Sequence, residues 1–346
     1  MRSGFVSIIG RPNAGKSTLL NALVGEKVAI VTAKPQTTRT RILGVVETPA
    51  RKGKHPAAQI VFVDTPGVHR PGSSLDKRMM QEVYDALEER DAVLLIVDAT
   101  RKLELTEADD AKKDSEDAFV FELIRKLDCP VFLLINKIDL VDREKLLPMI
   151  QQLSALHEFA EVIPISARKK DGLDRLIDKL VAVLPEGQRY FPKEQFTDQP
   201  ERFMVAELIR EKILLETGEE VPYASAVVVE RFEEPALLPA KGKKAMRDAR
   251  PPLTRISAAI YCERDGQKAI LIGKGGSKLK AIGTAARKEI ESLVGTRVFL
   301  ELRVIVKENW RESRGFVESL DWRRQLEEMG STQETERREQ GSDDGE

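Results

Sequence analysis

The first half of the chain alternates short apolar runs with a segment of helical spacing. The runs FVSIIG (5–10), IVFVD (60–64) and VFLLIN (131–136) are continuous and short, as in strands that are buried on both faces. After the first run, TLLNALVG (18–25) spaces its leucines along one face of a helix and ends in a glycine. This alternation predicts an α/β fold for residues 1–185.

The pattern changes after residue 185. Prolines at 185, 192 and 200 punctuate residues 186–200, which predicts a linker. The next segment, 201–216, predicts a helix, whereas KAILIG (268–273) predicts a strand on propensity alone. The other elements expected of a second domain, over 201–310, are strands at 225–234, 255–265 and 297–308 and a helix at 278–295.

The end of the chain differs from both domains. Residues 311–329 predict a terminal helix, and Trp310, Phe316 and Trp322 in and beside it are expected to dock on the second domain; the alternative is docking on a partner. Residues 330–346 are acidic and contain almost nothing to bury, which predicts a disordered tail.

Composition and charge refine this picture. No apolar run approaches the roughly 18 residues that a membrane span needs, and the first apolar run leaves no room for a signal peptide. We therefore expect a cytoplasmic protein. The net charge is −1, but the last twenty residues carry eight acidic and two basic side chains, which leaves +5 on the rest. The acidic stretch 104–117 is expected to be solvated surface, and the two cysteines and three histidines show no metal-ligand spacing.

One motif near the start carries specific chemistry. Residues 10–17 read GRPNAGKS, which fits G-x-x-x-x-G-K-[ST] between a strand and a helix. The two glycines let the backbone wrap around phosphates. Lys16 can neutralise the β- and γ-phosphates, and the Ser17 hydroxyl can bind Mg²⁺. The predicted nucleotide contacts here are Gly10, Arg11, Pro12, Asn13, Ala14, Gly15, Lys16, Ser17 and Thr18.

A second motif predicts which base is bound. NKID (136–139) follows a buried strand, and the Asp139 carboxylate can accept hydrogen bonds from N1–H and the exocyclic amino group of guanine. Adenine lacks that pair of donors, so the motif predicts guanine. The predicted contacts at this end are Asn136, Lys137, Ile138, Asp139, Ser166 and Ala167.

Between these motifs lies DTPGV (64–68), at the end of a strand. Asp64 can reach Mg²⁺ through water, and the Gly67 N–H can bond the γ-phosphate; Thr65, Pro66 and Val68 complete this predicted GTP-binding segment.

The stretch QTTRTR upstream contains the adjacent threonines Thr37 and Thr38. Thr38 is the predicted Mg²⁺ ligand beside Ser17, and Thr37 is the alternative. The predicted catalytic residues are Asn13, Lys16, Thr38 and Gly67.

In this order, the motifs are similar to those of the translation-factor class of small GTPases. The resemblance implies a P-loop GTPase domain with a mixed, mostly parallel sheet and a Mg²⁺ cofactor. Many such GTPases orient the attacking water with a glutamine directly after the D-x-x-G glycine, where this chain has Val68, so we expect slow turnover. In related GTPases with an asparagine at the position of Asn13, K⁺ sits beside the phosphates. Alternatively, Asn13 only tolerates the backbone angles of the loop.

A second glycine-rich loop lies in the other domain. GKGG (273–276) lacks the spacing of the first loop, so it does not predict a second nucleotide site. The elements around it resemble a type II KH domain, in which a G-x-x-G loop joins two helices and clamps single-stranded RNA. The resemblance implies an α+β domain in which KAILIG is a short helix, against its propensity. The predicted RNA contacts are Ile272, Gly273, Lys274, Gly275, Gly276, Ser277, Lys278 and Lys280.

A GTPase domain followed by a KH domain resembles the bacterial Era family, over about residues 4–312. The resemblance implies that the chain binds GTP and GDP, and that it binds the 3′ end of 16S rRNA to assist assembly of the 30S ribosomal subunit. It also implies peripheral association at the inner face of the cell membrane. We expect the chain to be a monomer.

Two other functions remain open on the residues alone. The chain could be a membrane-associated or cell-cycle GTPase whose second domain binds protein, and a Gly275→Asp change that leaves RNA binding intact would favour that reading. It could also be an RNA-binding module with a vestigial nucleotide site. In that case Lys16→Ala would change neither nucleotide affinity nor cellular function.

Overall fold

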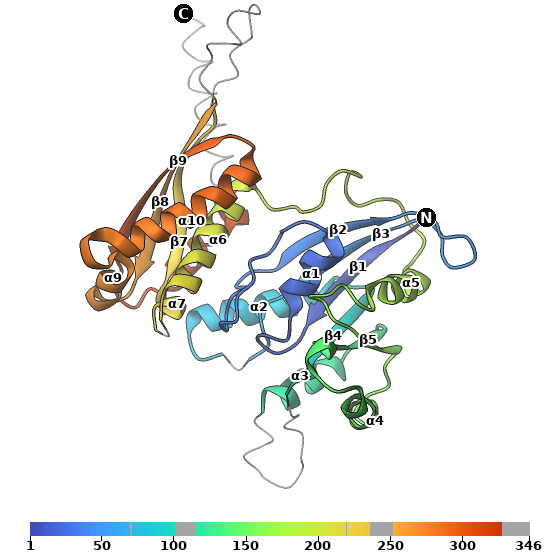
Figure 1. Cartoon of the computed structure of the whole chain (residues 1–346). Helices are drawn as coiled ribbons and strands as arrows, with labels where there is room; N and C mark the ends of the chain where they lie inside the picture. The colour runs from blue at the N-terminus through green and yellow to red at the C-terminus, as the bar shows by residue number, and fades with distance from the viewer. Residues whose placement is uncertain (70, 102–114, 219, 236–251, 327–346) are drawn as a thin grey trace, which may run out of the picture. The chain divides into compact units, whose positions relative to one another are not determined.

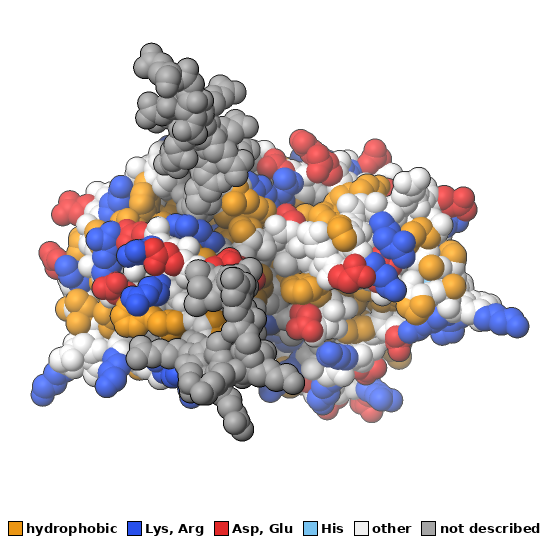
Figure 2. Space-filling view, turned by 90° about the horizontal axis from the view of Figure 1, so that it is seen from above, with side chains coloured by type: hydrophobic (Ala, Val, Ile, Leu, Met, Phe, Trp, Pro, Cys, Tyr) orange, Lys and Arg blue, Asp and Glu red, His pale blue; other side chains and the backbone are white. Residues whose placement is uncertain are grey.

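The computed structural model describes residues 1–69, 71–101, 115–218, 220–235 and 252–326 (Figure 1). They divide into two compact units, Met1–Pro71 with Met79–Pro200, and Gly72–Arg78 with the chain from Glu201 onward. The predicted acidic tail and most of the acidic stretch 104–117 lie outside the described residues. On the face shown in Figure 2, side chains of both charge signs are mixed with small hydrophobic patches.

The first unit is built on a six-stranded sheet of order β2-β3-β1-β4-β5-β6. Only β2 is antiparallel to its neighbour, which confirms the predicted mixed, mostly parallel sheet. The strands are β1 (Arg2–Ile9), β2 (Ile42–Thr48), β3 (Ala58–Asp64), β4 (Ala92–Asp98), β5 (Val131–Asn136) and β6 (Glu161–Pro164).

Helices cover both faces of this sheet. Buried leucines of α1 and α5 pack with Phe62 and Phe132 in one core cluster, and residues of α2, α3 and α4 pack with Leu95 and Leu133 in the other. The parallel strands end at one edge of the sheet, which is where ligands bind in open α/β folds. The helices are α1 (Lys16–Val24), α2 (Ser74–Glu88), α3 (Glu116–Ile124), α4 (Leu146–Ser154) and α5 (Leu173–Val183), with short 3₁₀ helices η2 (Ile138–Leu140) and η3 (Arg143–Lys145).

The predicted linker, 186–200, forms no helix or strand and is bonded to the first unit. Gln59 of β3 is fully buried, and its side-chain oxygen accepts hydrogen bonds from the backbone N–H groups of Tyr190 (2.8 Å) and Phe191 (3.0 Å). Further along, Phe196 O accepts a hydrogen bond from the backbone N–H of Val45, in the edge strand β2. The segment is therefore fixed to the sheet at several points.

The second unit contains a three-stranded sheet of order β7-β8-β9, in which β7 is antiparallel and β9 parallel to β8. Its core lies between this sheet and α6, α9 and α10. In chain order, the elements are α6 (Glu201–Glu216), α7 (Val221–Ala224), β7 (Ala226–Glu233), β8 (Leu253–Cys262), α9 (Asp265–Ile272), η4 (Lys274–Gly276), α10 (Ser277–Val294) and β9 (Arg297–Val306).

The segment KAILIG forms most of helix α9, so the strand predicted from propensity is wrong and the helix implied by the KH resemblance is confirmed. The Gln267 side chain accepts hydrogen bonds from the backbone N–H groups of Glu263 and Arg264, which caps the helix start. Gln267 and Leu271, one helical turn apart, are both buried. Tertiary packing and capping therefore override the β-rich composition.

The described part of the predicted terminal helix is interrupted. Helix α11 covers Arg314–Ser319, and a new helical turn begins after Asp321, whose carboxylate accepts a hydrogen bond from the backbone N–H of Arg323. An acidic side chain that bonds the backbone in this way favours a helix start over a helix interior. Trp310 and Trp322 are buried in the second unit, as expected, and Trp310 Nε1 donates to Ala224 O at 2.8 Å.

Candidate functional site

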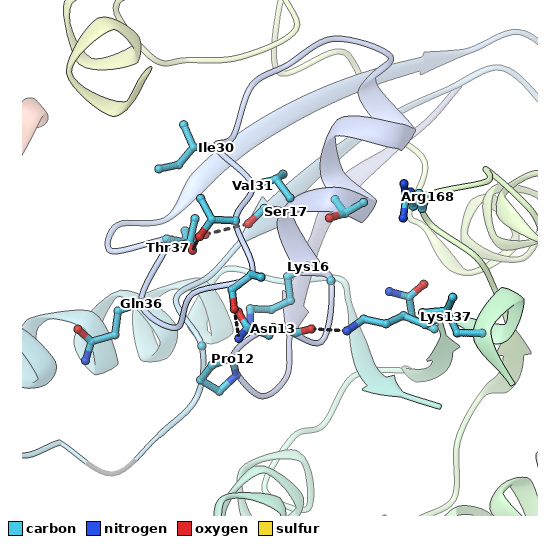
Figure 3. A pocket seen from close by; sticks show the side chains of 18 of the residues that line it. Pro12, Asn13, Lys16, Ser17, Ile30, Val31, Gln36, Thr37, Lys137 and Arg168 are labelled. Atoms are coloured by element: carbon cyan, nitrogen blue, oxygen red, sulfur yellow. Dashed lines mark hydrogen bonds between the residues drawn. The ribbon is translucent and has the colours of Figure 1, made fainter. Parts of the chain in front are cut away.

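A pocket of about 480 Å³ lies over the Gly10–Ser17 loop, where β1 passes into α1 (Figure 3). This volume is typical of ligand sites. Gly10 has φ +155°, and a Cβ there would lie 2.4 Å from Ile96 O. Gly15 has φ +104°, and a Cβ there would lie 2.3 Å from Asn136 Nδ2. Both positions therefore require glycine, so the loop can run close to its neighbours.

Lys16 is the buried cation of the pocket. Its Nζ donates hydrogen bonds to Gly10 O at 3.0 Å and Arg11 O at 2.9 Å. Burial lowers the pKa of Lys16 to about 8, although the nearby Asp64 carboxylate acts in the opposite direction. A buried, incompletely compensated ammonium group is suited to binding a phosphate.

Ser17, Thr38 and Asp64 meet beside Lys16. Ser17 Oγ donates to Asp64 Oδ2 at 2.6 Å and lies 2.8 Å from Thr38 Oγ1. Burial raises the pKa of Asp64 to about 6, and its Oδ1 has no hydrogen-bond partner among the described residues. Two hydroxyls and a buried carboxylate are hard oxygen donors, so this group fits Mg²⁺.

The neighbouring threonine makes different contacts. Thr37 Oγ1 donates to Lys34 O at 2.7 Å and lies 2.7 Å from Thr32 Oγ1, within its own loop. The geometry therefore supports Thr38 over Thr37 as the residue that joins Ser17.

The NKID segment is connected to the Gly10–Ser17 loop. Asn136 Nδ2 donates to Ala14 O at 2.9 Å, and Asn136 Oδ1 accepts a hydrogen bond from Ala167 N at 3.0 Å. Lys137 adopts a left-handed φ of 67° and donates to Asn13 O at 2.9 Å (Figure 3). One asparagine and one lysine thus hold together three loops that are far apart in the sequence.

Asp139 lines the pocket, as a guanine-binding carboxylate must. Its Oδ1 accepts a hydrogen bond from Ser166 Oγ at 2.7 Å, and this bond lowers the pKa of Asp139. The carboxylate is therefore held ionised and oriented, ready to accept two hydrogen bonds from a base.

Gly67, the last residue of the D-x-x-G motif, and Val68, which follows it, lie in different surroundings. Gly67 lines the pocket, and a Cβ there would lie 2.7 Å from Pro12 Cγ, so only glycine allows this approach. Val68 is fully buried and packs with Ile9, Met80 and Val83 in the core. The residue that follows Gly67 therefore points away from the phosphate side of the pocket.

The geometry of Asn13 fits both roles that the sequence leaves open, a contact to K⁺ and tolerance of the backbone angles of the loop. Its φ of 63° is left-handed, which asparagine tolerates better than most residues. Its Nδ2 also donates to Ala33 O at 2.7 Å, in the loop before Thr37. Asn13 Oδ1 accepts no hydrogen bond from a described residue.

The second glycine loop joins α9 to α10 through η4. Gly273, Gly275 and Gly276 all have positive φ, and a Cβ on Gly275 or Gly276 would meet nothing within 4 Å. The loop backbone is therefore open to a ligand. Lys274 and Lys280 are exposed, whereas Lys278 Nζ donates to Glu216 O at 2.6 Å and so helps to anchor α10.

A groove of about 420 Å³ continues from this loop between α10 and the edge strand β9. Lys280, Arg287 and Phe299 line it, with Gly276 at one end. Sequence reasoning identified the loop but missed this groove, because its second wall comes from a strand about twenty residues further along. The residues added to the candidate RNA site are Leu279, Gly283, Thr284, Arg287, Val298, Phe299, Leu300 and Leu302.

Comparison with known proteins agrees with both halves of this geometry. A family model described as 50S ribosome-binding GTPase matches residues 5–137, and a KH domain model matches 238–311. GTPase Era of Geotalea uraniireducens is 47% identical over 312 residues, which cover 90% of this chain and 95% of that protein. The chain belongs to the GTPase Era family. GTPase Era of Heliobacterium modesticaldum is 45% identical and covers 94% of this chain and 99% of its own.

Solved Era structures are similar over the same extent. A variant of Aquifex aeolicus Era bound to GDP·AlF₄⁻ is 38% identical with a TM-score of 0.79, and it covers 92% of this chain and 98% of its own. Era in complex with MgGDPNP and nucleotides 1506–1542 of 16S ribosomal RNA is 39% identical with a TM-score of 0.81 and the same coverage. The Era family assignment makes the chain a P-loop GTPase with a KH domain.

The pocket also contains residues that the Era motifs do not include. Arg168 and Leu140 each follow a motif by one residue, which is the signal that could have found them. Asp98 does not line the pocket, but from a different strand it forms an ion pair with Lys137 at 2.6 Å, which no local pattern shows. The other added lining residues come from the loop before Thr37, and they are Ile30, Val31, Thr32, Ala33 and Gln36.

Several predicted GTP contacts support the pocket without lining it. Arg11 turns away and forms ion pairs with Glu116 (2.9 Å) and Asp117 (2.8 Å) at the start of α3. The others are Gly10, Ala14, Asp64, Thr65, Pro66, Val68, Ile138, Ser166 and Ala167. In the part of the chain that the structure describes, no helix combines the length and the apolar content needed to cross a membrane.

Proposed function

We propose that this Era-family GTPase is a slow GTP switch that binds the 3′ end of 16S rRNA and assists assembly of the 30S ribosomal subunit. The observation that carries the proposal is one chain with a complete GTP pocket and an open, lysine-bearing KH loop. The similar Era solved with MgGDPNP and nucleotides 1506–1542 of 16S rRNA supports the choice of ligands. The matched KH model and the exposed cations favour RNA over a protein partner.

In this proposal the pocket residues hold the nucleotide at both ends. Asp139 accepts the two guanine N–H donors, oriented by Ser166. Lys16 transfers its hydrogen bonds from loop carbonyls to phosphate oxygens, and the Gly67 N–H senses the γ-phosphate. When these contacts are lost on hydrolysis, the loops that carry Thr38 and Gly67 are released.

Ser17 and Thr38 would hold Mg²⁺ directly, and Asp64 would hold it through water. The bound ion would neutralise charge on the β- and γ-phosphates. Since Val68 is buried and cannot orient water, hydrolysis depends on the remaining groups and is slow.

K⁺ beside Asn13 is a finer part of the proposal. Because Nδ2 is bonded to Ala33 O, Oδ1 is the side-chain atom that remains for a cation. We expect GTP hydrolysis to be faster in K⁺ than in Na⁺, and Asn13→Gly, which keeps the left-handed backbone, to lose that difference. A K⁺ preference that persists in Asn13→Gly would show that the cation is held elsewhere. A cytoplasmic location, a monomeric state and peripheral membrane association stay predictions.

The first experiment measures RNA affinity in two nucleotide states. Labelled RNA of nucleotides 1506–1542 is titrated by fluorescence anisotropy with protein loaded with GDP or with a non-hydrolysable GTP analogue. We expect tighter binding with the analogue, by tenfold or about 1.4 kcal/mol. Lys16→Ala should remove the difference.

Two controls separate the sites. Gly275→Asp should weaken RNA binding in both states because its carboxylate repels the backbone, whereas Gly275→Asn, of the same shape, should weaken it much less. If wild-type protein fails to bind the RNA in either state, the proposed function is wrong. Equal affinities in the two states would contradict the coupling alone.

A further inference from the structure

The sheet of the second unit has a face that the core does not use. Along β9, Val298 and Leu300 belong to the core side, while the alternate residues Arg297 and Phe299 are exposed. The register places Arg255 of β8 directly beside Phe299. The far end of the same face is covered, because the Phe316 ring packs 4.9 Å from Tyr261. Among the described residues, the part of this face that stays uncovered is thus the end where β8 and β9 begin.

Phe299 is the prominent side chain of this open part. Its side chain is 54% exposed, and the Arg255 guanidinium carbon lies 5.9 Å from the ring centroid. A single exposed hydrophobic residue is common on protein surfaces. Phe299 differs because it also lines the groove between α10 and β9. It therefore stands at the edge where the candidate RNA groove meets the open sheet face.

The charges on both sides of Phe299 favour a polyanion. Lys280 and Arg287 lie on the groove side, and Arg255 and Arg297 lie on the sheet side; none of the four forms an ion pair with a described residue. Two nearby carboxylates form ion pairs with arginines, Glu233 with Arg231 and Glu230 with Arg303. A third, Glu301, accepts a hydrogen bond from Ser257 Oγ. A ligand with a negative backbone and flat apolar groups suits this combination.

We propose that Phe299 is a base-stacking platform that extends the RNA site from the groove, across the edge of β9, onto the open sheet face. The proposal rests on the proposed RNA-binding function and adds a position to it. A KH groove holds about four nucleotides. The platform takes a base outside those four, with Arg255 against the adjoining phosphate. Stacking on an aromatic ring tolerates any base, so this position adds affinity more than sequence preference.

Anisotropy with the 1506–1542 RNA tests the affinity. Phe299→Ala should weaken binding by about tenfold, the usual effect of removing one stacked base. Phe299 is exposed and faces away from the core, so the variant should keep its thermal unfolding midpoint. Phe299→Tyr should bind like wild type, and so should Leu147→Ala, which removes an exposed apolar side chain from α4 in the other unit.

Tryptophan fluorescence gives a direct second readout. The natural tryptophans, Trp310 and Trp322, are 0% and 7% exposed, so Phe299→Trp adds the one solvent-facing indole among the described residues. The emission of this variant should be quenched by the full RNA but not by a four-nucleotide RNA that fills only the groove.

The outcomes are distinct. Quenching by the long RNA, together with the loss of affinity in Phe299→Ala, supports the platform. If wild type binds the RNA but Phe299→Ala binds within twofold of it, or the emission of Phe299→Trp does not change, the platform is wrong and the proposed function stands. Failure of wild-type protein to bind RNA would overturn the proposed function first.

Discussion

At the scale of single residues, Val68 shows that a motif position can be occupied without contributing to chemistry. Its side chain is fully buried beside Met80 and Val83. We therefore expect Val68→Gln to bury an unpaired amide, to destabilise the protein by about 1–3 kcal/mol, and not to accelerate GTP hydrolysis. Thermal unfolding and single-turnover hydrolysis measure the two effects. A tenfold faster rate in the variant would show that this side chain can reach the nucleotide.

Asp64 gives a prediction about pH. Burial raises its pKa from 3.8 to about 6, so the folded protein binds this proton more tightly than the unfolded chain does. The corresponding stability is fully present below pH 3.8 and is lost as the pH rises through about 6. Without nucleotide and Mg²⁺, Asp64→Asn should therefore stabilise the protein by about 2 kcal/mol more at pH 7 than at about pH 4.5.

Urea unfolding at the two pH values measures this difference, with Asp139→Asn as a control in which the shift has the opposite direction. Lowering of the Asp139 pKa by Ser166 means that Asp139→Asn should destabilise more at neutral than at low pH. An Asp64→Asn effect that is independent of pH would show that its carboxyl titrates normally in the fold.

At the scale of elements, the sequence predicted the glycine loops, because few other residues can adopt their backbone conformation. It missed contacts made by residues on distant strands. Gly10 and Gly15 are recognisable because their positive φ and close neighbours exclude other residues. Thr38 and Thr37 carry the same local sequence pattern, and only their contacts in the fold distinguish them. KAILIG shows the opposite case, in which packing and the Gln267 cap outweigh propensity.

The linker illustrates the same limit and yields a prediction. Its prolines suggest a free connection, but buried Gln59 bonds the backbone of Tyr190 and Phe191 from a strand more than 130 residues earlier. Gln59→Leu leaves these groups unpaired, so hydrogen exchange of the two amides should accelerate at least tenfold, which corresponds to about 1.4 kcal/mol. Thr197→Val removes the hydrogen bonds of this hydroxyl with Leu43 O and Gln199 N but none to Tyr190 or Phe191, so it should leave these two amides protected. Unchanged exchange in Gln59→Leu would mean that other contacts hold the segment.

At the scale of the whole molecule, the linker leads from the first unit to Glu201 of the second, and it is bonded to β2. That strand begins four residues after Thr38, and it meets the linker through Val45 N–H to Phe196 O and Thr197 Oγ1 to Leu43 O. The change at Thr38 that we propose on nucleotide exchange would therefore act on a strand to which the linker is fixed. Such a connection can transmit a nucleotide state to the RNA site.

This route predicts a loss of coupling between the nucleotide and the RNA site, an effect that a loss of local stability alone would not produce. The double variant Gln59→Leu, Thr197→Val should bring the ratio of RNA affinities in the GTP-analogue and GDP states close to one. Because none of the altered groups lines the nucleotide pocket or the groove, GTP affinity and RNA affinity in the GDP state should stay within about twofold of wild type. Anisotropy in both states measures the ratio. A wild-type ratio that persists in the double variant would show that the units communicate by another route.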